Sequence, residues 1–112
     1  MEAKYETLLD DEMKAYLARC DALYPADAVD LDIAGQRRVY DEMCADFDVG
    51  RPEGVTVTDE DHGGVPCRRY EPHGDAAATV VYYHGGGFVV GGLDSHDSIC
   101  AEICANTGPV SY

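Results

Sequence analysis

The chain has 112 residues and a formal net charge of −14, from 22 Asp and Glu residues against 8 Lys and Arg residues. This length suffices for one small domain or for part of a larger α/β enzyme, and the acidity disfavours nucleic acid and anionic membranes as partners because both would repel the chain. The scarcity of lysine fits either a salt-adapted host or simply an acidic surface.

Two amphipathic helices are expected within the first 48 residues. Apolar side chains recur at three- and four-residue intervals across residues 5–22, with the helix start expected near Asp10. A second such pattern runs from residue 33 to residue 47, with Asp30 as the expected N-cap. Residues 1–48 are therefore interpreted as an amino-terminal helical segment that packs on the rest of the protein, and more specifically as a cap over a substrate pocket.

A β-rich part is expected from residue 49 onward. Gly and Pro indicate a linker at 49–54, after which residues 55–58 and 65–71 form a predicted hairpin around a turn at 61–64. Pro66 predicts an edge position for the second of these strands, because proline lacks the N–H that a central strand donates. The continuous apolar run at 76–83 predicts a third, central strand that is covered on both faces.

A helix and the beginning of a fourth strand are expected after residue 93. Asp94 or Ser95 is the expected N-cap, and Gly108-Pro109 should end the helix. Residues 110–112 then predict the first part of a fourth strand. The helix carries an apolar stripe that consists of Ile99, Cys100, Ile103 and Cys104.

Two groupings of reactive side chains on this helix have simpler explanations. Ser95-His96-Asp97 contains the residue types of a catalytic triad, but neighbours on a helix point about 100° apart and should not form a relay among themselves. His96 is instead expected to pack under the neighbouring glycines. His96, Cys100 and Cys104 share one helical face, where a buried apolar stripe is favoured over a metal site because no fourth ligand stands at suitable spacing. No metal or organic cofactor is expected.

The cellular compartment is predicted from the amino terminus and the cysteines. Residues 1–6 lack the basic and apolar regions of a secretory signal, and the longest apolar stretch, 76–83, is too short to span a bilayer. The five cysteines are an odd number without a framework-like spacing, which favours reduced thiols. A cytoplasmic protein without a membrane span is expected.

The most specific pattern in the sequence is His84-Gly85-Gly86-Gly87-Phe88, directly after the predicted central strand. Successive glycines leave backbone N–H groups open to close approach by a ligand, as an oxyanion hole requires. A purely structural glycine turn is the alternative. His84 is expected to orient the glycines through a hydrogen bond rather than to act as a catalytic base, because it stands at the strand end immediately before them.

Further segments accompany this motif, namely Arg51-Pro52-x-Gly54-Val55, Val65-Pro66-Cys67-Arg68-Arg69-Tyr70, and Leu93-Asp94-Ser95-His96-Asp97 with Cys100. Together with the glycine motif, they make residues 12–110 resemble the amino-terminal third of a hormone-sensitive-lipase-like carboxylesterase. The resemblance implies an α/β class: the amino-terminal part of an α/β-hydrolase fold, with cap helices, β-hairpin, central strand and helix, in which residues 49–112 start the catalytic domain. It also implies that the N–H groups of Gly86 and Gly87 bind the oxyanion, with Gly85 and His84 in the supporting loop.

The resemblance further implies a nucleophilic serine in a G-x-S-x-G segment, followed by Asp and His, and the 112 residues contain no such segment. We expect a chain that stops before the nucleophile elbow, either as a truncated product or because its remainder lies outside this sequence. The expected function is hydrolysis of small-molecule carboxylic esters. The alternatives are an inactive product, a ligand-binding protein, and a fragment that self-associates or associates with a missing carboxy-terminal part.

Overall fold

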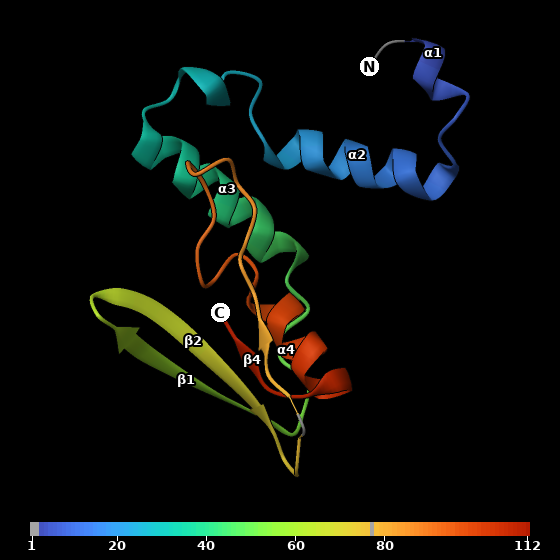
Figure 1. Ribbon diagram of the computed structural model, residues 1–112. Helices are drawn as coiled ribbons and strands as arrows, with labels where there is room; N and C mark the ends of the chain where they lie inside the picture. Colours follow the sequence, from blue (N-terminus) through green and yellow to red (C-terminus); the bar gives the residue numbers. More distant parts are fainter. Residues whose placement is uncertain (1–2, 77) are drawn as a thin grey trace.

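The computed structural model describes residues 3–76 and 78–112. The elements in chain order are α1 (Ala3–Glu6), α2 (Asp11–Leu23), the 3₁₀-helix η1 (Ala28–Asp30), α3 (Ile33–Phe47), β1 (Val55–His62), β2 (Val65–Pro72), β3 (Val80–Val81), α4 (Asp97–Thr107) and β4 (Val110–Ser111). The radius of gyration is 16.9 Å, against about 13 Å for a compact domain of this length. The excess arises because α1 and α2 extend away from the sheet (Figure 1).

The amino-terminal helices begin at aspartate caps. Asp10 accepts a hydrogen bond from the Met13 N–H at 2.8 Å and so caps α2, whose start was expected near this residue. The cap of α3 is Asp32, whose carboxylate accepts from the Gly35 N–H at 2.7 Å. The prediction of Asp30 was wrong, because the chain makes the extra turn η1 and Asp30 ends it.

The two long strands form the predicted hairpin and extend further toward its tip than expected. β1 pairs with β2 antiparallel, with Val55 opposite Pro72 and His62 opposite Val65. Gly63 and Gly64 connect the strands with φ angles of +66° and +89°, as a two-residue hairpin turn of the favoured type requires. The sheet order is β1-β2-β4-β3, in which β2 and β4 are antiparallel and β3 and β4 are parallel.

The predicted edge position of β2 was wrong, because β2 lies between β1 and β4. The Arg68 N–H donates to the Tyr112 carbonyl at 2.7 Å, so alternate N–H groups of β2 face β4. Pro66 lies two residues earlier, outside the part of β2 that pairs with β4. Its missing N–H therefore removes no hydrogen bond between described strands, and the proline is compatible with an interior strand.

The predicted third strand is shorter and more exposed than expected. Among the described residues of the predicted strand, 76 and 78–83, only Val80 and Val81 form β3; residue 77 lies outside the described residues. β3 is at the edge of the described sheet, and Val80 and Val81 are 40% and 60% exposed. The prediction of a central strand covered on both faces was wrong for this chain. Within the described sheet, β3 pairs with one strand, β4, and over two residues, so its other edge has no neighbour.

The core lies between α4 and the sheet. Its buried residues are Tyr70, Cys100, Ala101, Cys104, Val110 and Tyr112. Gly108 ends α4 with a φ of +149°, and Pro109 follows as predicted. All five cysteines are unpaired, and burial together with the charge of Asp97 raises the pKa of Cys100 to about 12. Within the described ranges, no helix has the length and hydropathy that crossing a membrane requires.

Candidate active site

Residues 84–93, here called the glycine loop, connect β3 to the segment before α4. The Gly86 carbonyl accepts hydrogen bonds from the N–H groups of Val89 and Val90 at 3.0 and 3.1 Å, which closes a single turn. Gly86 has a φ of +135°, and a Cβ atom there would lie 2.0 Å from the Val90 carbonyl oxygen. The turn therefore requires glycine at this position.

The N–H groups of Gly86 and Gly87 donate to no acceptor among the residues that the structure describes. Both glycines line a cavity of about 870 Å³ that also borders the ends of β3 and β4 and the start of β2. Phe88 follows with a φ of +62° and a fully exposed side chain. Two unsatisfied donors beside an open cavity are the arrangement that anion binding needs.

The imidazole of His84 contacts the glycines that follow it in the loop, as was expected from the sequence. Its Nδ1 lies 2.6 Å from the Gly85 carbonyl oxygen, and a Cβ atom on Gly91 would lie 2.6 Å from the same nitrogen. The His84 ring is 5.7 Å from the ring of His96 and 5.9 Å from that of Tyr112, measured between centroids. The contact with Gly91 depends on tertiary packing and had no signal in the sequence pattern.

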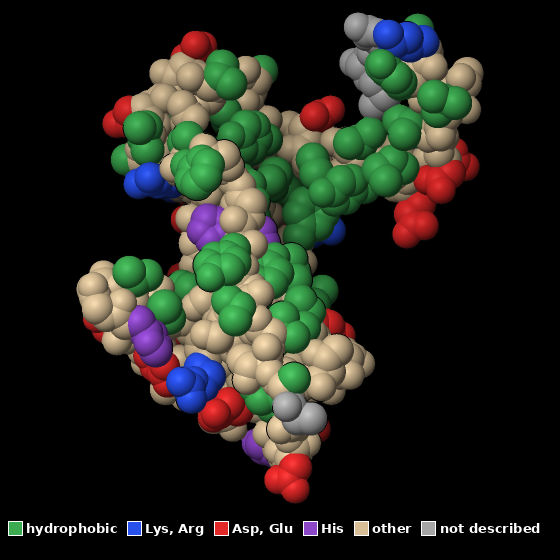
Figure 2. Space-filling model, in the orientation of Figure 1, with side chains coloured by type: hydrophobic (Ala, Val, Ile, Leu, Met, Phe, Trp, Pro, Cys, Tyr) green, Lys and Arg blue, Asp and Glu red, His purple; other side chains and the backbone are tan. Residues whose placement is uncertain are grey.

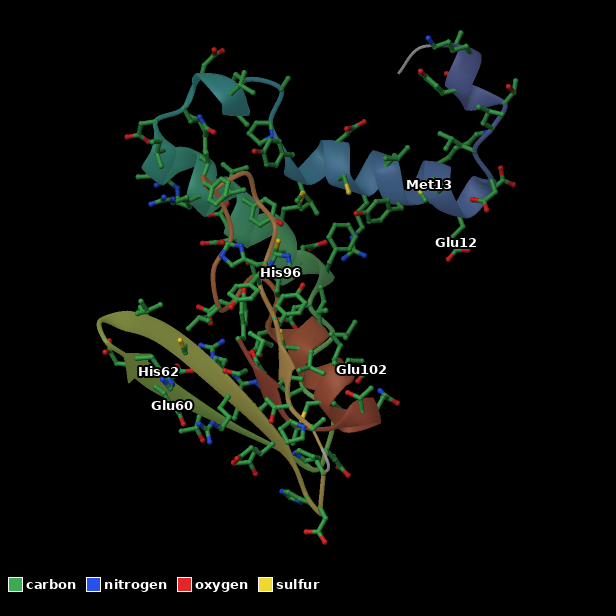
Figure 3. All side chains as sticks on the ribbon, viewed as in Figure 1. Glu12, Met13, Glu60, His62, His96 and Glu102 are labelled. Atoms are coloured by element: carbon green, nitrogen blue, oxygen red, sulfur yellow. The ribbon has the colours of Figure 1, made fainter. Side chains whose placement is uncertain are left out.

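His96 lies directly before α4, at the narrow waist of the molecule (Figure 3). Figure 2 shows histidine side chains at this waist, between the helical part and the sheet. Burial lowers the pKa of His96, and the neighbouring His84 lowers it further. The ring of His96 thus belongs to an aromatic group behind the glycine loop, with Tyr82, His84 and Tyr112 as its other members.

Ser95 and His96 are hydrogen bonded to each other, contrary to the prediction that neighbours in this segment would not be. Ser95 Oγ lies 2.8 Å from His96 Nδ1, because both residues precede α4 and so do not have helical geometry. The Ser95 hydroxyl also donates to the Gly92 carbonyl and accepts from the Gly92 N–H, both at 2.9 Å. Asp97 bonds instead to Tyr70, whose hydroxyl lies 2.6 Å away. These three neighbours therefore form no triad, and Ser95 ties the glycine loop to the start of α4.

A cluster of charged side chains around the buried Arg68 holds the end of the glycine loop. Arg68 is 8% exposed and donates to the Leu93 carbonyl at 3.2 Å, to Asp94 and Asp97 at 3.0 Å, and to Asp59 at 2.6 Å. These bonds explain why neither Asp94 nor Ser95 caps α4 as predicted: the Asp94 carboxylate is bonded to Arg68 and the Ser95 hydroxyl to Gly92.

Asp97 is the acidic centre of this cluster. Burial alone would raise its pKa, but hydrogen bonds from Arg51, Tyr70 and Arg68 lower it. Burial and the bond to Asp97 raise the pKa of Tyr70. The cluster was not predicted from the sequence, although Arg68 and Tyr70 stand two apart on one strand and so share a face. The alternation of side chains between the two faces of a strand was the pattern that could have indicated the cluster.

Two further contacts hold the glycine loop. The Tyr112 hydroxyl donates to the Gly92 carbonyl. From α3, Arg37 Nε donates to the Val89 carbonyl at 2.6 Å, a contact that was not predicted from the sequence. In the described part of the chain, no group of three or more His, Cys, Asp and Glu side chains is arranged to hold a metal ion.

A family profile described as the α/β-hydrolase fold matches residues 80–111, the part that contains the glycine loop and α4. The acetyl esterase of Salmonella agona is 36% identical over 105 residues, which are 91% of this chain and 32% of that protein. The chain thus spans about a third of the length of the curated relative it matches.

Solved structures of an ester hydrolase and of a hormone-sensitive lipase are also similar to the chain. An ester hydrolase from the metagenome of Lake Arreo superposes with a TM-score of 0.75 at 33% identity, covering 92% of this chain and 36% of that one. A hormone-sensitive lipase from a metagenome library superposes with a TM-score of 0.62 at 30% identity, covering 72% and 28%.

The sheet order, the helix α4 that connects the parallel strands β3 and β4, and the glycine loop define the first part of an α/β hydrolase. Within that class, the chain is a hormone-sensitive-lipase-like α/β hydrolase over the partial length that it spans.

Proposed function

We propose that the protein containing residues 1–112, called the parent protein below, hydrolyses small-molecule esters with short to medium acyl groups through an acyl-serine intermediate. In this proposal Gly86 and Gly87 donate to the oxyanion, and Gly85 and His84 support the loop. The observation that carries it is the pair of unsatisfied N–H groups in the hydrogen-bonded turn beside the cavity. The esterase relatives support the ester chemistry.

The two N–H groups act on the carbonyl oxygen of the ester. When a serine oxygen forms a bond to the carbonyl carbon, the carbonyl oxygen gains the negative charge, and fixed donors stabilise it without reorganising. The alcohol then leaves with a proton, and water later releases the acid from the acyl serine. The serine and its Asp and His partners are proposed to lie in the parent protein outside residues 1–112.

The proposal extends to the organisation of the chain. Residues 1–48 form a helical cap segment, and residues 49–112 start the catalytic domain. The hydrogen bond from Arg37 of α3 to the glycine loop supports a cap that borders the site. The five unpaired cysteines support a reducing, cytoplasmic location.

The test compares the parent protein with the 112-residue chain, using p-nitrophenyl acetate as substrate. The parent protein should show turnover that a serine-directed inhibitor abolishes, and the 112-residue chain should be no faster than a denatured control. Inhibitor-sensitive turnover by the 112-residue chain would contradict the placement of the triad. A parent protein that binds the ester without cleaving it would be a ligand-binding protein.

By itself, the 112-residue chain is proposed to be marginally stable or to self-associate, or to associate with a missing carboxy-terminal part. Large apolar side chains near the site are exposed, including Val81 at 60%, Tyr83 at 86% and Phe88 at 106%. Size-exclusion chromatography with light scattering should show oligomers or a broad distribution. A monodisperse monomer with a sharp thermal transition in low salt would refute this expectation.

A further inference from the structure

We propose that Arg37 is a positioning residue for the oxyanion donor Gly87, acting through two hydrogen-bonded peptide groups. The inference rests on the proposed function, because it takes the Gly87 N–H as a donor to the oxyanion. Arg37 Nε donates to the Val89 carbonyl at 2.6 Å across 52 residues of sequence. Among the described residues, this is the only hydrogen bond between α3 and the glycine loop, which lie side by side in Figure 1.

The Val89 carbonyl is connected to the Gly87 N–H by peptide geometry. It shares a peptide group with the Val90 N–H, which donates to the Gly86 carbonyl at 3.1 Å. The Gly86 carbonyl in turn shares a peptide group with the Gly87 N–H. Because a trans peptide group is planar, its N–H points opposite to its C=O. Holding the Val89 carbonyl therefore helps to hold the direction of the Gly87 N–H.

The charge of Arg37 adds to this geometric effect. A guanidinium remains charged at any working pH, and hydrogen bonds in a chain polarise one another by about 10–30% per bond. The Gly87 N–H at the end of the chain thus becomes a stronger donor to a negatively charged oxygen. The effect should be partial, because Arg37 is exposed and the Val89 N–H also binds the Gly86 carbonyl.

The neighbouring Arg38 is a matched control. It is exposed on the same helix and has no hydrogen bond or ion pair within the described part of the chain. Arg38→Gln therefore makes the same change in composition and net charge as Arg37→Gln without touching the loop. Arg37→Lys keeps the charge near the Val89 carbonyl and serves as the conservative variant.

The test measures kcat and KM of the parent protein with p-nitrophenyl acetate, together with hydrogen exchange of the Val89 and Val90 amides. Arg37→Gln should lower kcat by about threefold to tenfold, with KM within about twofold of wild type. It should also speed exchange at both amides. Arg37→Lys should recover at least half of the lost kcat, and Arg38→Gln should match the wild type in both measurements.

The inference would be overturned if Arg37→Gln matched Arg38→Gln in kcat and in amide exchange. It would also be overturned if its loss appeared in KM and melting temperature alone, since that pattern belongs to a general packing role. If the wild-type parent protein cleaves no ester, the proposed function fails. The exchange measurement then still decides whether Arg37 holds the turn.

Discussion

Helices α2 and α4 have similar lengths and both carry apolar stripes, yet they differ in burial. α4 buries Cys100, Ala101 and Cys104 against the sheet, whereas α2 buries no residue. α2 contacts α3 instead, through the rings of Tyr16 and Phe47 at 5.3 Å and through Arg19 over the Phe47 ring at 4.2 Å. An amphipathic pattern thus indicates a helix, but what lies opposite its apolar face decides how much that face contributes to stability.

The largest expected effect comes from comparing two arginines, Arg68 beside α4 and Arg19 in α2. Arg68→Met should lower the free energy of unfolding of the parent protein by about 2–3 kcal/mol, because the Asp97 carboxylate, which is 14% exposed, loses one of its donors. The other two partners, Asp59 and Asp94, are 64% and 92% exposed and can be hydrated instead. Arg19→Met removes the same charge from an ion pair with Asp46 whose side chains are 52% and 42% exposed, and should cost less than about 1 kcal/mol. Urea denaturation measures both. Equal losses would show that the two regions are equally coupled to folding.

The second prediction concerns the glycine loop, which accepts hydrogen bonds from Arg37, Arg68 and Tyr112. Gly86→Val should lower kcat of the parent protein by about 10²–10³-fold with KM little changed, because the loop loses an oxyanion donor. The clash at the Val90 carbonyl gives the structural cause. Gly85→Ala is the comparison, since a Cβ atom on Gly85 would meet nothing within 4 Å and its φ is not positive. A smaller loss for Gly86→Val than for Gly85→Ala would refute the assignment.

The third prediction uses pH. Burial and the nearby His84 lower the pKa of His96 in the folded state, so the unfolded chain binds the proton more readily. The contribution of His96 to the free energy of unfolding is therefore complete above the pKa of about 6.5 that histidine has in the unfolded chain. It decreases as pH falls through that value, by at most about 1.4 kcal/mol per pH unit.

The free energy of unfolding should accordingly decrease between pH 7.5 and pH 5, and His96→Asn should reduce that decrease. Asp97 acts in a separate window: its lowered pKa stabilises the fold above about pH 4, and that contribution is lost only as pH falls further. An unchanged slope in the His96 variant would contradict the burial of a neutral imidazole behind the loop.

The smallest effect is expected in the helical region. Asp10→Ala removes the cap bond to Met13 and should destabilise α2 by about 1 kcal/mol. Because α2 buries no residue, the loss should appear as faster hydrogen exchange within α2, with little change in global unfolding. A matching loss of global stability would show that α2 unfolds together with the sheet.

Sequence and structure agree where local chemistry decides. The cap at Asp10, the hairpin turn at Gly63-Gly64 and the helix stop at Gly108 depend on residues within a few positions. The glycine motif was recognisable for the same reason, since Gly86 must adopt a φ that other residues avoid. The assignment of Gly86 and Gly87 as oxyanion donors stays a prediction.

Only the tertiary structure decided the features that join distant segments. The order of the strands placed Pro66 on an interior strand and Val80 at an edge, because pairing partners come from elsewhere in the chain. The bonds from Arg68 to Asp97 and from Arg37 to Val89 span 29 and 52 residues. Local propensity carries no information about such distances. The sequence by itself therefore determined the two long amino-terminal helices, the hairpin and the position of the glycines, while long-range packing decided the strand order and the contacts that hold the glycine loop.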